Sequence, residues 1–356
     1  MDLKSEIMRL SSLRGVSGDE GAVSADLAAR LRPLTDSVSV DPFGNVVAMR
    51  GSSRTGAPKL LIDVHIDQAG LMVTEVTDDG FARFSPIGID ARILLSNEMT
   101  ILTRNGPLKA IVSALPPHLQ EDGDELKAPR PEDMTLDLGM SGEKARELIR
   151  PGDFAVYDTR PVELLGGTIA GPAMDNRAGL AAVLHALEGL AGVELPCQLA
   201  VAGVTREESG LHGAEQVVRR ERPEYIVVVD ACHARTPDAG KYERVHEMGG
   251  GPVIGRGANS SPRMAEALIA VTERENIPYQ LEAIPRTSRT DAWAAQIAAC
   301  GAATVVVSLP VRYMHMPVET VRLDDVEALG KLLCAFCRDF RGLDFQGLNG
   351  EGGRVS

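Results

Sequence analysis

The sequence predicts an α/β protein with a mostly parallel sheet flanked by helices and interrupted by a small β-rich domain. From Gly171 onward, helical patterns alternate with short apolar runs, which is typical of parallel strands joined by crossover helices. Residues 69 to about 163 differ, because they form a series of short β-like runs with turn signals such as Asn105-Gly106. We therefore expect one α/β domain made of residues 1–67 and 164–356, with the β-rich domain inserted at residues 68–163.

The elements of the α/β domain follow from the spacing of their apolar residues. Residues 3–34 place apolar side chains at intervals of three and four, which predicts two helices separated by the break GVSGDE. The next segment alternates around a Pro-Phe-Gly-Asn turn, which predicts a hairpin over 37–51. Buried strands are predicted at residues 59–65, 198–204, 224–230 and 302–310, and further helices at 179–190, 210–221, 262–276 and from 324.

Composition and charge restrict the class of protein and its partners. The 356 residues are 44% hydrophobic and 24% charged, as in folded globular proteins, and they suffice for about two domains. The 50 acidic residues outnumber the 37 Lys and Arg residues, which gives a formal net charge of −13. This charge disfavours binding to a phosphate backbone or an anionic lipid surface. We therefore expect no nucleic acid and no membrane among the partners.

Three features predict a cytoplasmic location. The N-terminal segment carries charges among its apolar residues and lacks the apolar core of a secretory signal. The longest apolar runs are far short of the ~20 residues that span a bilayer. The five cysteines are sparse and odd in number, which fits reduced thiols. Cys334 and Cys337 form a CxxC pair at helical spacing, which we interpret as core packing because no second CxxC completes a zinc site.

Several common catalytic and nucleotide-binding motifs are absent from the sequence. It contains no G-x-x-x-x-G-K-[ST], and its glycine-rich GGGPVIGRG does not match G-x-G-x-x-G. It also contains no G-x-S-x-G and no H-E-x-x-H. These absences argue against a P-loop, a dinucleotide site, a serine nucleophile elbow and a helix-borne zinc site.

Acidic and imidazole side chains stand instead at the ends of the apolar runs, where the carboxyl ends of parallel strands line the ligand crevice of an open sheet. They are His65, Asp67, Asp175, Glu207, Glu208, Asp230 and His315. Taken singly, such a carboxylate is most often an N-cap or a solvated turn residue, and such a histidine is most often a hydrogen-bonded core residue. Their coincidence at one sheet edge favours a metal site, because like charges placed together repel unless a cation lies between them.

This set of residues predicts two divalent ions with mixed imidazole and carboxylate ligands, which suits zinc, cobalt or manganese. Water held between such ions becomes a nucleophile near neutral pH, and a separate carboxylate must accept its proton. The adjacent Glu207 and Glu208 suit this division, since neighbouring side chains diverge and one can bind an ion while the other stands beside the water. Asp67 could orient the imidazole of His65.

Six segments, in chain order, resemble the tetrahedral aminopeptidase family of dinuclear metallopeptidases, which includes glutamyl and deblocking aminopeptidases. They are VHIDQAGLMV, GPAMDNRAG, VTREESGLHGA, VVDACHA, SRTDAWA and LPVRYMHMPVE. The resemblance covers nearly the whole chain. It implies a catalytic α/β domain of the metallo-aminopeptidase type, with a mixed sheet and an inserted small β-barrel. It also implies a homo-oligomer, with a hollow tetrahedral dodecamer as the form common among family members.

The resemblance also implies a role for each candidate. Asp175 would bridge both metals, with His65 and Asp230 on one ion and Glu208 and His315 on the other. Glu207 would be the general base, and Asp67 would lie behind the first histidine. The implied cofactors are two divalent ions per chain, zinc or cobalt foremost. Asp291 matches a family loop near the substrate, although a turn role fits it equally, and His233 is expected to be structural.

Two positions beside the proposed ligands depart from the family pattern. Gln68 stands where the family usually reads Glu in HMDE, and Asn176 stands where it usually reads Asp in DDR. Each change removes one negative charge. Since neither residue is an implied ligand, we expect metal binding to survive, with an altered metal affinity, metal preference or recognition of the substrate amine.

The expected function is therefore that of a metal-dependent aminopeptidase, a hydrolase that removes N-terminal residues from short peptides with a free N-terminus. A two-metal deacylase or carboxypeptidase would use the same ligands on blocked or C-terminal substrates. A catalytically silent peptide-binding or assembly protein is the alternative outside the enzymes, suggested by Gln68 and Asn176. A glycosidase is disfavoured, because it needs two carboxyl groups at least ~5 Å apart on opposite sides of a sugar, and the adjacent Glu207 and Glu208 serve that poorly.

Overall fold

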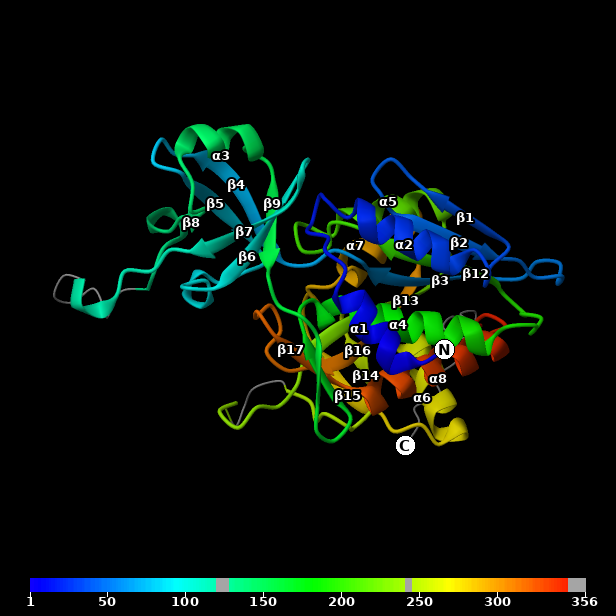
Figure 1. Ribbon diagram of the computed structural model, residues 1–356. Coiled ribbons are helices and arrows are strands. Elements are labelled where there is room, and N and C mark those ends of the chain that lie inside the picture. The colour runs from blue at the N-terminus through cyan, green and yellow to red at the C-terminus, as the bar shows by residue number, and fades with distance from the viewer. Residues whose placement is uncertain (120–127, 241–244, 345–356) are drawn as a thin grey trace.

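The computed structural model describes residues 1–119, 128–240 and 245–344. Its centre is an eight-stranded sheet with helices on both faces (Figure 1). In sheet order the strands are β1 (Ser37–Val40), β2 (Val46–Arg50), β12 (Gln198–Val204), β3 (Lys59–His65), β13 (Tyr225–His233), β16 (Ala303–Val311), β14 (Val253–Gly257) and β15 (Gln280–Ile284). The neighbours β12, β3, β13 and β16 are parallel, as are β14 and β15, whereas the pairs β1–β2, β2–β12 and β14–β16 are antiparallel. The predicted α/β class with a mixed, mostly parallel sheet is confirmed.

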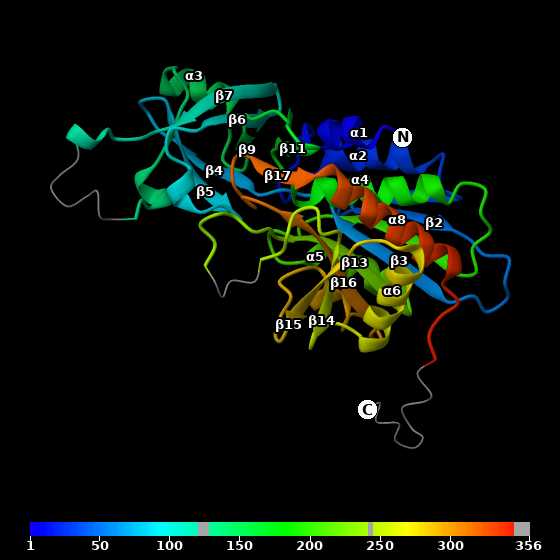
Figure 2. The same ribbon diagram turned by 90° about the horizontal axis from the view of Figure 1, so that it is seen from below.

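The helices divide unequally between the two faces of the sheet. One face is covered by α1 (Leu3–Ser11), α2 (Gly21–Leu31), α4 (Met174–Gly189), α6 (Pro262–Glu275) and α8 (Leu323–Asp339). Figure 2 shows α1, α4 and α8 together on one side. The other face carries the shorter α5 (His212–Glu221) and α7 (Ala292–Ala295). No described helix is both long and apolar enough to cross a bilayer.

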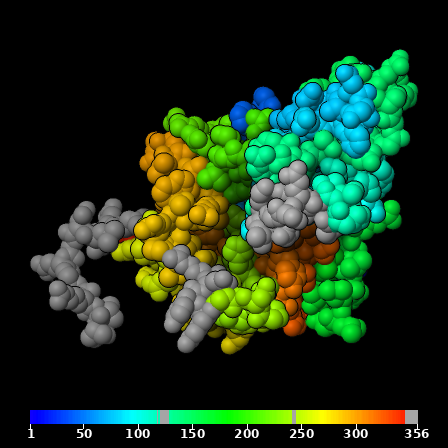
Figure 3. All heavy atoms as spheres, turned by 90° about the vertical axis from the view of Figure 1, so that its left-hand side faces the viewer, coloured from blue at the N-terminus to red at the C-terminus, as the bar shows by residue number. Residues whose placement is uncertain are grey.

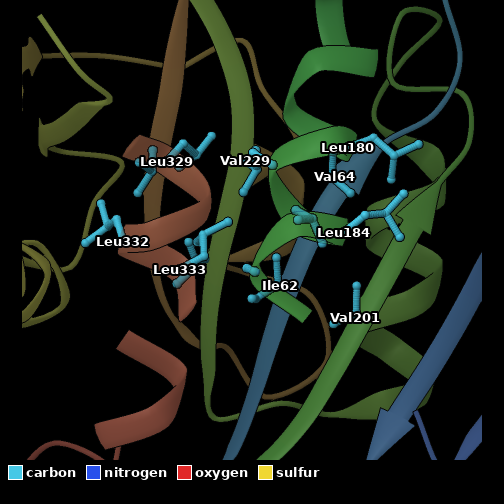
Figure 4. Packing of buried hydrophobic residues seen from close by; sticks show 14 of the residues in the cluster. Ile62, Val64, Leu180, Leu184, Val201, Val229, Leu329, Leu332 and Leu333 are labelled. Atoms are coloured by element: carbon cyan, nitrogen blue, oxygen red, sulfur yellow. The ribbon is translucent and has the colours of Figure 1, made fainter. Parts of the chain in front are cut away.

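The main hydrophobic core lies between the sheet and the two longest helices. Figure 4 shows residues of α4 and α8, such as Leu184 and Leu333, beside residues of the central strands, such as Ile62, Val201 and Val229. Successive residues of a strand point to opposite faces of the sheet, and helices bury both faces here. These strands are therefore nearly uninterrupted apolar runs. The predicted core packing of the CxxC pair holds, because Cys337 is buried in this core, Cys334 packs against it, and all five cysteines are free.

A closed six-stranded barrel is inserted between β3 and α4 and has a hydrophobic core of its own. Its strands are β4 (Gly70–Val76), β5 (Phe81–Ile87), β6 (Glu98–Thr103), β7 (Gly106–Val112), β8 (Leu136–Asp137) and β9 (Phe154–Tyr157). The same segment holds the 3₁₀ turns η1 (Ala91–Ile93), η2 (Pro117–Leu119) and η4 (Pro131–Asp133), and the helix α3 (Gly142–Leu148). We propose the two domain boundaries near residues 68 and 163 because the sequence pattern changes there between short β-like runs and the patterns of the α/β domain.

A small third sheet connects the barrel exit to the C-terminal part of the chain. It consists of β10 (Val162–Leu164), β11 (Thr168–Gly171) and β17 (Glu319–Arg322), all antiparallel, with Gly171 opposite Glu319. Since β11 leads directly into α4 and β17 follows the loop after β16, this sheet brings two distant loops together. The two loops carry the candidates Asp175 and His315.

Candidate metal centre

The predicted site residues come from the carboxyl ends of neighbouring strands and from the loops beside them. His65 is the last residue of β3, and β3 is parallel to β13, where Val64 lies opposite Val229 and Asp230 follows. Glu207 and Glu208 follow β12, which pairs with the other side of β3. Asp175 lies in the first turn of α4, and His315 lies in the loop between β16 and β17. The parallel register therefore carries separate segments of the sequence to one edge of the sheet.

The side chains form two groups that share Asp175. In the first group, His65 Nε2 lies 3.1 Å from Asp175 Oδ1 and 3.6 Å from Asp230 Oδ1. In the second group, His315 Nε2 lies 3.5 Å from Asp175 Oδ2 and 3.2 Å from Glu208 Oε1. The potential ligand atoms of each group lie within 4.8 Å of one another, so each group could hold one metal ion. Asp175 offers one carboxylate oxygen to each.

The pKa shifts of the two histidines show that each group favours positive charge. The carboxylates Asp175 and Glu208 outweigh burial and raise the pKa of His315 to about 11. Burial lowers the pKa of His65, but its contacts with Asp175 and Asp230 outweigh burial and raise it. In each group the surrounding carboxylates thus favour the protonated form of the imidazole. A divalent cation would replace these protons, as expected of a metal site, where imidazole binds in its neutral form. The donor set therefore fits two metal ions.

Glu207 stands beside both groups without belonging to either. Burial raises its pKa to about 9, with further contributions from the nearby charges of Asp230, Glu208 and Asp175, while His65 opposes the shift. A carboxyl group with a raised pKa is a better proton acceptor when it is ionised by a nearby cation. The position of Glu207 is therefore suited to proton transfer.

Asp67 connects the first histidine to the two glutamates. Its carboxylate lies 3.5 Å from His65 Nδ1, and it accepts hydrogen bonds from the backbone N–H groups of Glu207 and Glu208, both at 3.1 Å. The Ser17 hydroxyl also donates to Asp67. Asp67 can therefore orient the imidazole ring and fix the backbone of the Glu-Glu segment at the same time.

Sequence reasoning missed several residues that hold the site. Glu20 accepts the Arg206 N–H at 3.1 Å, directly before Glu207, and Glu319 accepts backbone N–H groups of the loops that carry Asp175 and His315. Glu20 and Ser17 lie in the segment GVSGDE, which the sequence indicates only as a break between helices. An acidic residue four positions after His315 was the one available signal for Glu319.

The two departures from the family pattern have structural roles in this chain. Gly15 N–H donates to the side-chain carbonyl of Gln68 at 3.3 Å, which ties the N-terminal segment to the start of the barrel. Asn176 Nδ2 donates to the carbonyl of Val229 at 2.7 Å, next to Asp230. An ionised aspartate could not donate this bond. Neither Gln68 nor Asn176 belongs to the two ligand groups.

The two groups open onto a cavity of about 930 Å³. Glu207, Glu208, Asp230 and His315 line it, together with the loop 286–290 and the exposed His233. The barrel borders the second group from the other side, through residues of its entry and exit segments, Gln68, Ala69 and Tyr157. Figure 3 faces the side of the molecule where the barrel stands beside the α/β domain.

Comparison with known proteins agrees with the fold and the site. The chain is 34% identical to the lysyl aminopeptidase of Pyrococcus furiosus over 338 residues, covering 93% of this chain and 95% of the relative. The structure of an aminopeptidase from Desulfurococcus kamchatkensis superposes with a TM-score of 0.88 at 32% identity, with 95% of each chain covered. The TET1 peptidase of Pyrococcus horikoshii superposes with a TM-score of 0.84 at 28% identity, covering 95% of this chain and all (100%) of that one.

These likenesses make the protein a peptide hydrolase. The model of the M42 glutamyl aminopeptidase family matches residues 44–332, and the chain belongs to this family. The predicted resemblance to the tetrahedral aminopeptidases and the predicted enzyme class are thereby confirmed.

Asp63 and Asp291 form a second acidic contact beneath the site. Both are buried, and no hydrogen-bond donor from the described residues reaches their carboxylate oxygens. Burial raises the pKa of Asp63 to about 7, although His65 and the contact with Asp291 oppose the shift. Burial and the charge of Asp63 raise the pKa of Asp291 as well. One proton shared by the two carboxyl groups explains how they tolerate each other.

We expect Asp63→Asn to stabilise the metal-free protein above neutral pH. A raised pKa means that the parent's stability from this group is complete at low pH and is lost as the pH rises through about 7. The asparagine donates a hydrogen bond at every pH. Thermal unfolding should therefore favour the variant by on the order of 2 kcal/mol more at about pH 8 than at about pH 5.5. Asp78→Asn, at a fully exposed side chain, is the control. A pH-independent difference for Asp63→Asn would contradict the shared proton.

We expect Gly88→Ala, directly after β5 of the barrel, to weaken metal binding by the second group. Gly88 has φ +69°, and a Cβ atom there would lie 2.6 Å from Glu208 Oε2, so the glutamate must move. Calorimetric titration with Zn²⁺ should show binding about 10-fold weaker or more. Gly106→Ala also places a side chain at a positive φ, +110°, but meets no atom within 4 Å, and should bind as the parent does. Equal losses in both variants would show that strain alone is responsible.

Proposed function

We propose that the protein is a two-metal aminopeptidase that removes N-terminal residues from short peptides. His65 and Asp230 would bind one ion, Glu208 and His315 the other, and Asp175 both. The observation that carries the proposal is the position of Asp175, whose two oxygens face two separate imidazole–carboxylate groups. Two imidazoles and three carboxylates suit zinc or cobalt. When bound, such a pair of divalent ions polarises the peptide carbonyl and makes water nucleophilic at neutral pH.

The remaining residues of the site would handle the proton. Glu207 would accept a proton from the attacking water and pass it to the amine that leaves when the peptide C–N bond breaks. Its place in the cavity beside Glu208, Asp230 and Asp175 would let it hold that proton between the two steps. Asp67 would keep the His65 ring in position and hold the Glu207 backbone. This division of roles explains why two adjacent glutamates are present.

A free N-terminal amine fits the charge of the site. The site is rich in carboxyl groups, with Glu207 and Asp67 beside the proposed ligands Asp175, Glu208 and Asp230. A protonated α-amine is attracted to such a site, whereas an acylated nitrogen carries no charge. The cavity of about 930 Å³ has room for a short peptide. These features favour an aminopeptidase over a deacylase or carboxypeptidase.

We propose the assembly of the protein from similarity to a relative, and a cytoplasmic location from its cysteines. The TET1 peptidase of Pyrococcus horikoshii can assemble into a tetrahedron or a large octahedral shell. By similarity we propose a homo-oligomer for this chain, with a tetrahedral dodecamer as the expected form. The free cysteines agree with the reducing cytoplasm.

Glu207→Gln should keep the bound metal ions but lose most of the parent's rate of peptide hydrolysis. An amide cannot accept the proton from water, so turnover of amino-acid anilides should fall ~10²–10⁴-fold. Glu208→Gln, the same change one residue later, should instead reduce the metal content, because this residue faces His315 as a ligand. Elemental analysis and anilide turnover measure both effects. Parental turnover in Glu207→Gln would refute its role as the base, and a metal-free, inactive parent would favour the silent homologue.

Blocking the substrate amine should abolish hydrolysis. Peptides with a free N-terminus should be cleaved at least about 100-fold faster than the same peptides after N-acetylation, because acetylation removes the charge that the site attracts. Mass spectrometry of the products also shows which end is removed. Faster cleavage of the acetylated peptides, or release of C-terminal residues, would favour the deacylase or carboxypeptidase.

A further inference from the structure

We propose that Glu319 is a positioning residue that holds the backbones of Asp175 and His315 at the spacing that two metal ions require. This inference rests on the proposed function, because it concerns two of the proposed ligands. Glu319 is the first residue of β17, and only 3% of it is exposed. Asp175 N–H donates to Glu319 Oε2 at 2.9 Å, and His315 N–H donates to Oε1 at 2.6 Å.

The contacts of Glu319 join two segments that lie just beyond the paired residues of β11 and β17. Asp175 follows β11, and His315 precedes β17, and these two strands pair with Gly171 opposite Glu319. Each carboxylate oxygen takes one of the two N–H groups. The carboxylate therefore fixes the distance between the ligand shared by both groups and the imidazole of the second group.

Both segments have backbone conformations that need such support. His315 has φ +62° and Ala173, two residues before Asp175, has φ +53°, a region that residues other than glycine rarely adopt. Asp175 is also buried, so its N–H would lack a partner without Glu319. A metal ion binds the side chains and cannot satisfy these N–H groups.

The chemistry of the contact is specific to a carboxylate. Burial and the charge of Asp175 raise the pKa of Glu319 to about 8, and the two N–H groups oppose this rise because they favour the ionised form. Two backbone donors, one on each oxygen, require two acceptor atoms without hydrogens, which the ionised carboxylate provides. A glutamine of the same size has one acceptor, and its NH₂ group would face one of the two donors. Glu319→Gln should therefore release one of the two ligand segments while it keeps the volume of the side chain.

Asp325 provides a matched control elsewhere in the fold. It is buried and accepts the N–H groups of Gly249 at 2.7 Å and Gly251 at 2.8 Å. Asp325→Asn removes the same kind of double contact, and Asp325 belongs to neither ligand group. A loss of metal binding that is confined to Glu319→Gln is then a result of its contacts with the ligand segments.

The experiment titrates the metal-free parent and both variants with Co²⁺ and follows heat and the visible spectrum. We expect Glu319→Gln to bind Co²⁺ ~10–100-fold more weakly than the parent, the range typical for partners that orient ligands, with an altered spectrum. Asp325→Asn should match the parent in both. Parental affinity and spectrum in Glu319→Gln would overturn the inference. A parent that binds no Co²⁺ would overturn the proposed function instead.

Hydrogen exchange of the metal-free parent decides the question if Glu319→Gln does not fold. The amides of Asp175 and His315 should already be protected before metal is added, because Glu319 and not the ion accepts their hydrogen bonds. Exchange of both amides at the rate of an unprotected chain, with protection appearing only with Co²⁺, would overturn the inference. This measurement does not depend on activity.

Discussion

The concentration of buried acidic groups at the carboxyl edge of the sheet is the constraint on which the rest of the structure depends. Burial raises the pKa of Glu207, Glu208 and Asp230, and carboxylates hold protons on His65 and His315. So many acids in a region of low dielectric are tolerable only when positive charge lies among them. Without cations, the repulsion among these buried carboxylates destabilises the fold at this edge. For the same reason the edge is a strong candidate site for two divalent cations.

A second set of carboxylates stabilises the irregular backbone that carries the first. Asp67 accepts the N–H groups of Glu207 and Glu208, Glu20 that of Arg206, and Glu319 those of the loops holding Asp175 and His315. The site is therefore held mainly by hydrogen bonds from backbone to buried acid, and its loops have little regular secondary structure of their own. Such support orients ligands before any ion or substrate binds.

The insertion point of the barrel explains how a separate core contributes to the site. β3 ends at His65, and the chain passes through Asp67 and Gln68 into β4 within a few residues. The barrel therefore stands at the edge where the candidate ligands gather, and its Gly88 closely approaches Glu208.

The sequence by itself determined the central strands β3, β12, β13 and β16, because strands buried on both faces must be apolar runs. Polar residues at or beyond their ends marked His65, Glu207, Glu208, Asp230 and His315 as candidates, and Asp175 was marked by its place directly before a predicted helix. It did not reveal the short strands β10, β11, β14, β15 and β17, because three to five residues are too few to show a clear period. The roles of Ser17, Glu20 and Glu319 were decided by the tertiary structure alone. Their partners are backbone N–H groups, which every residue except proline carries, so only the folded chain selects which carboxylate meets which amide.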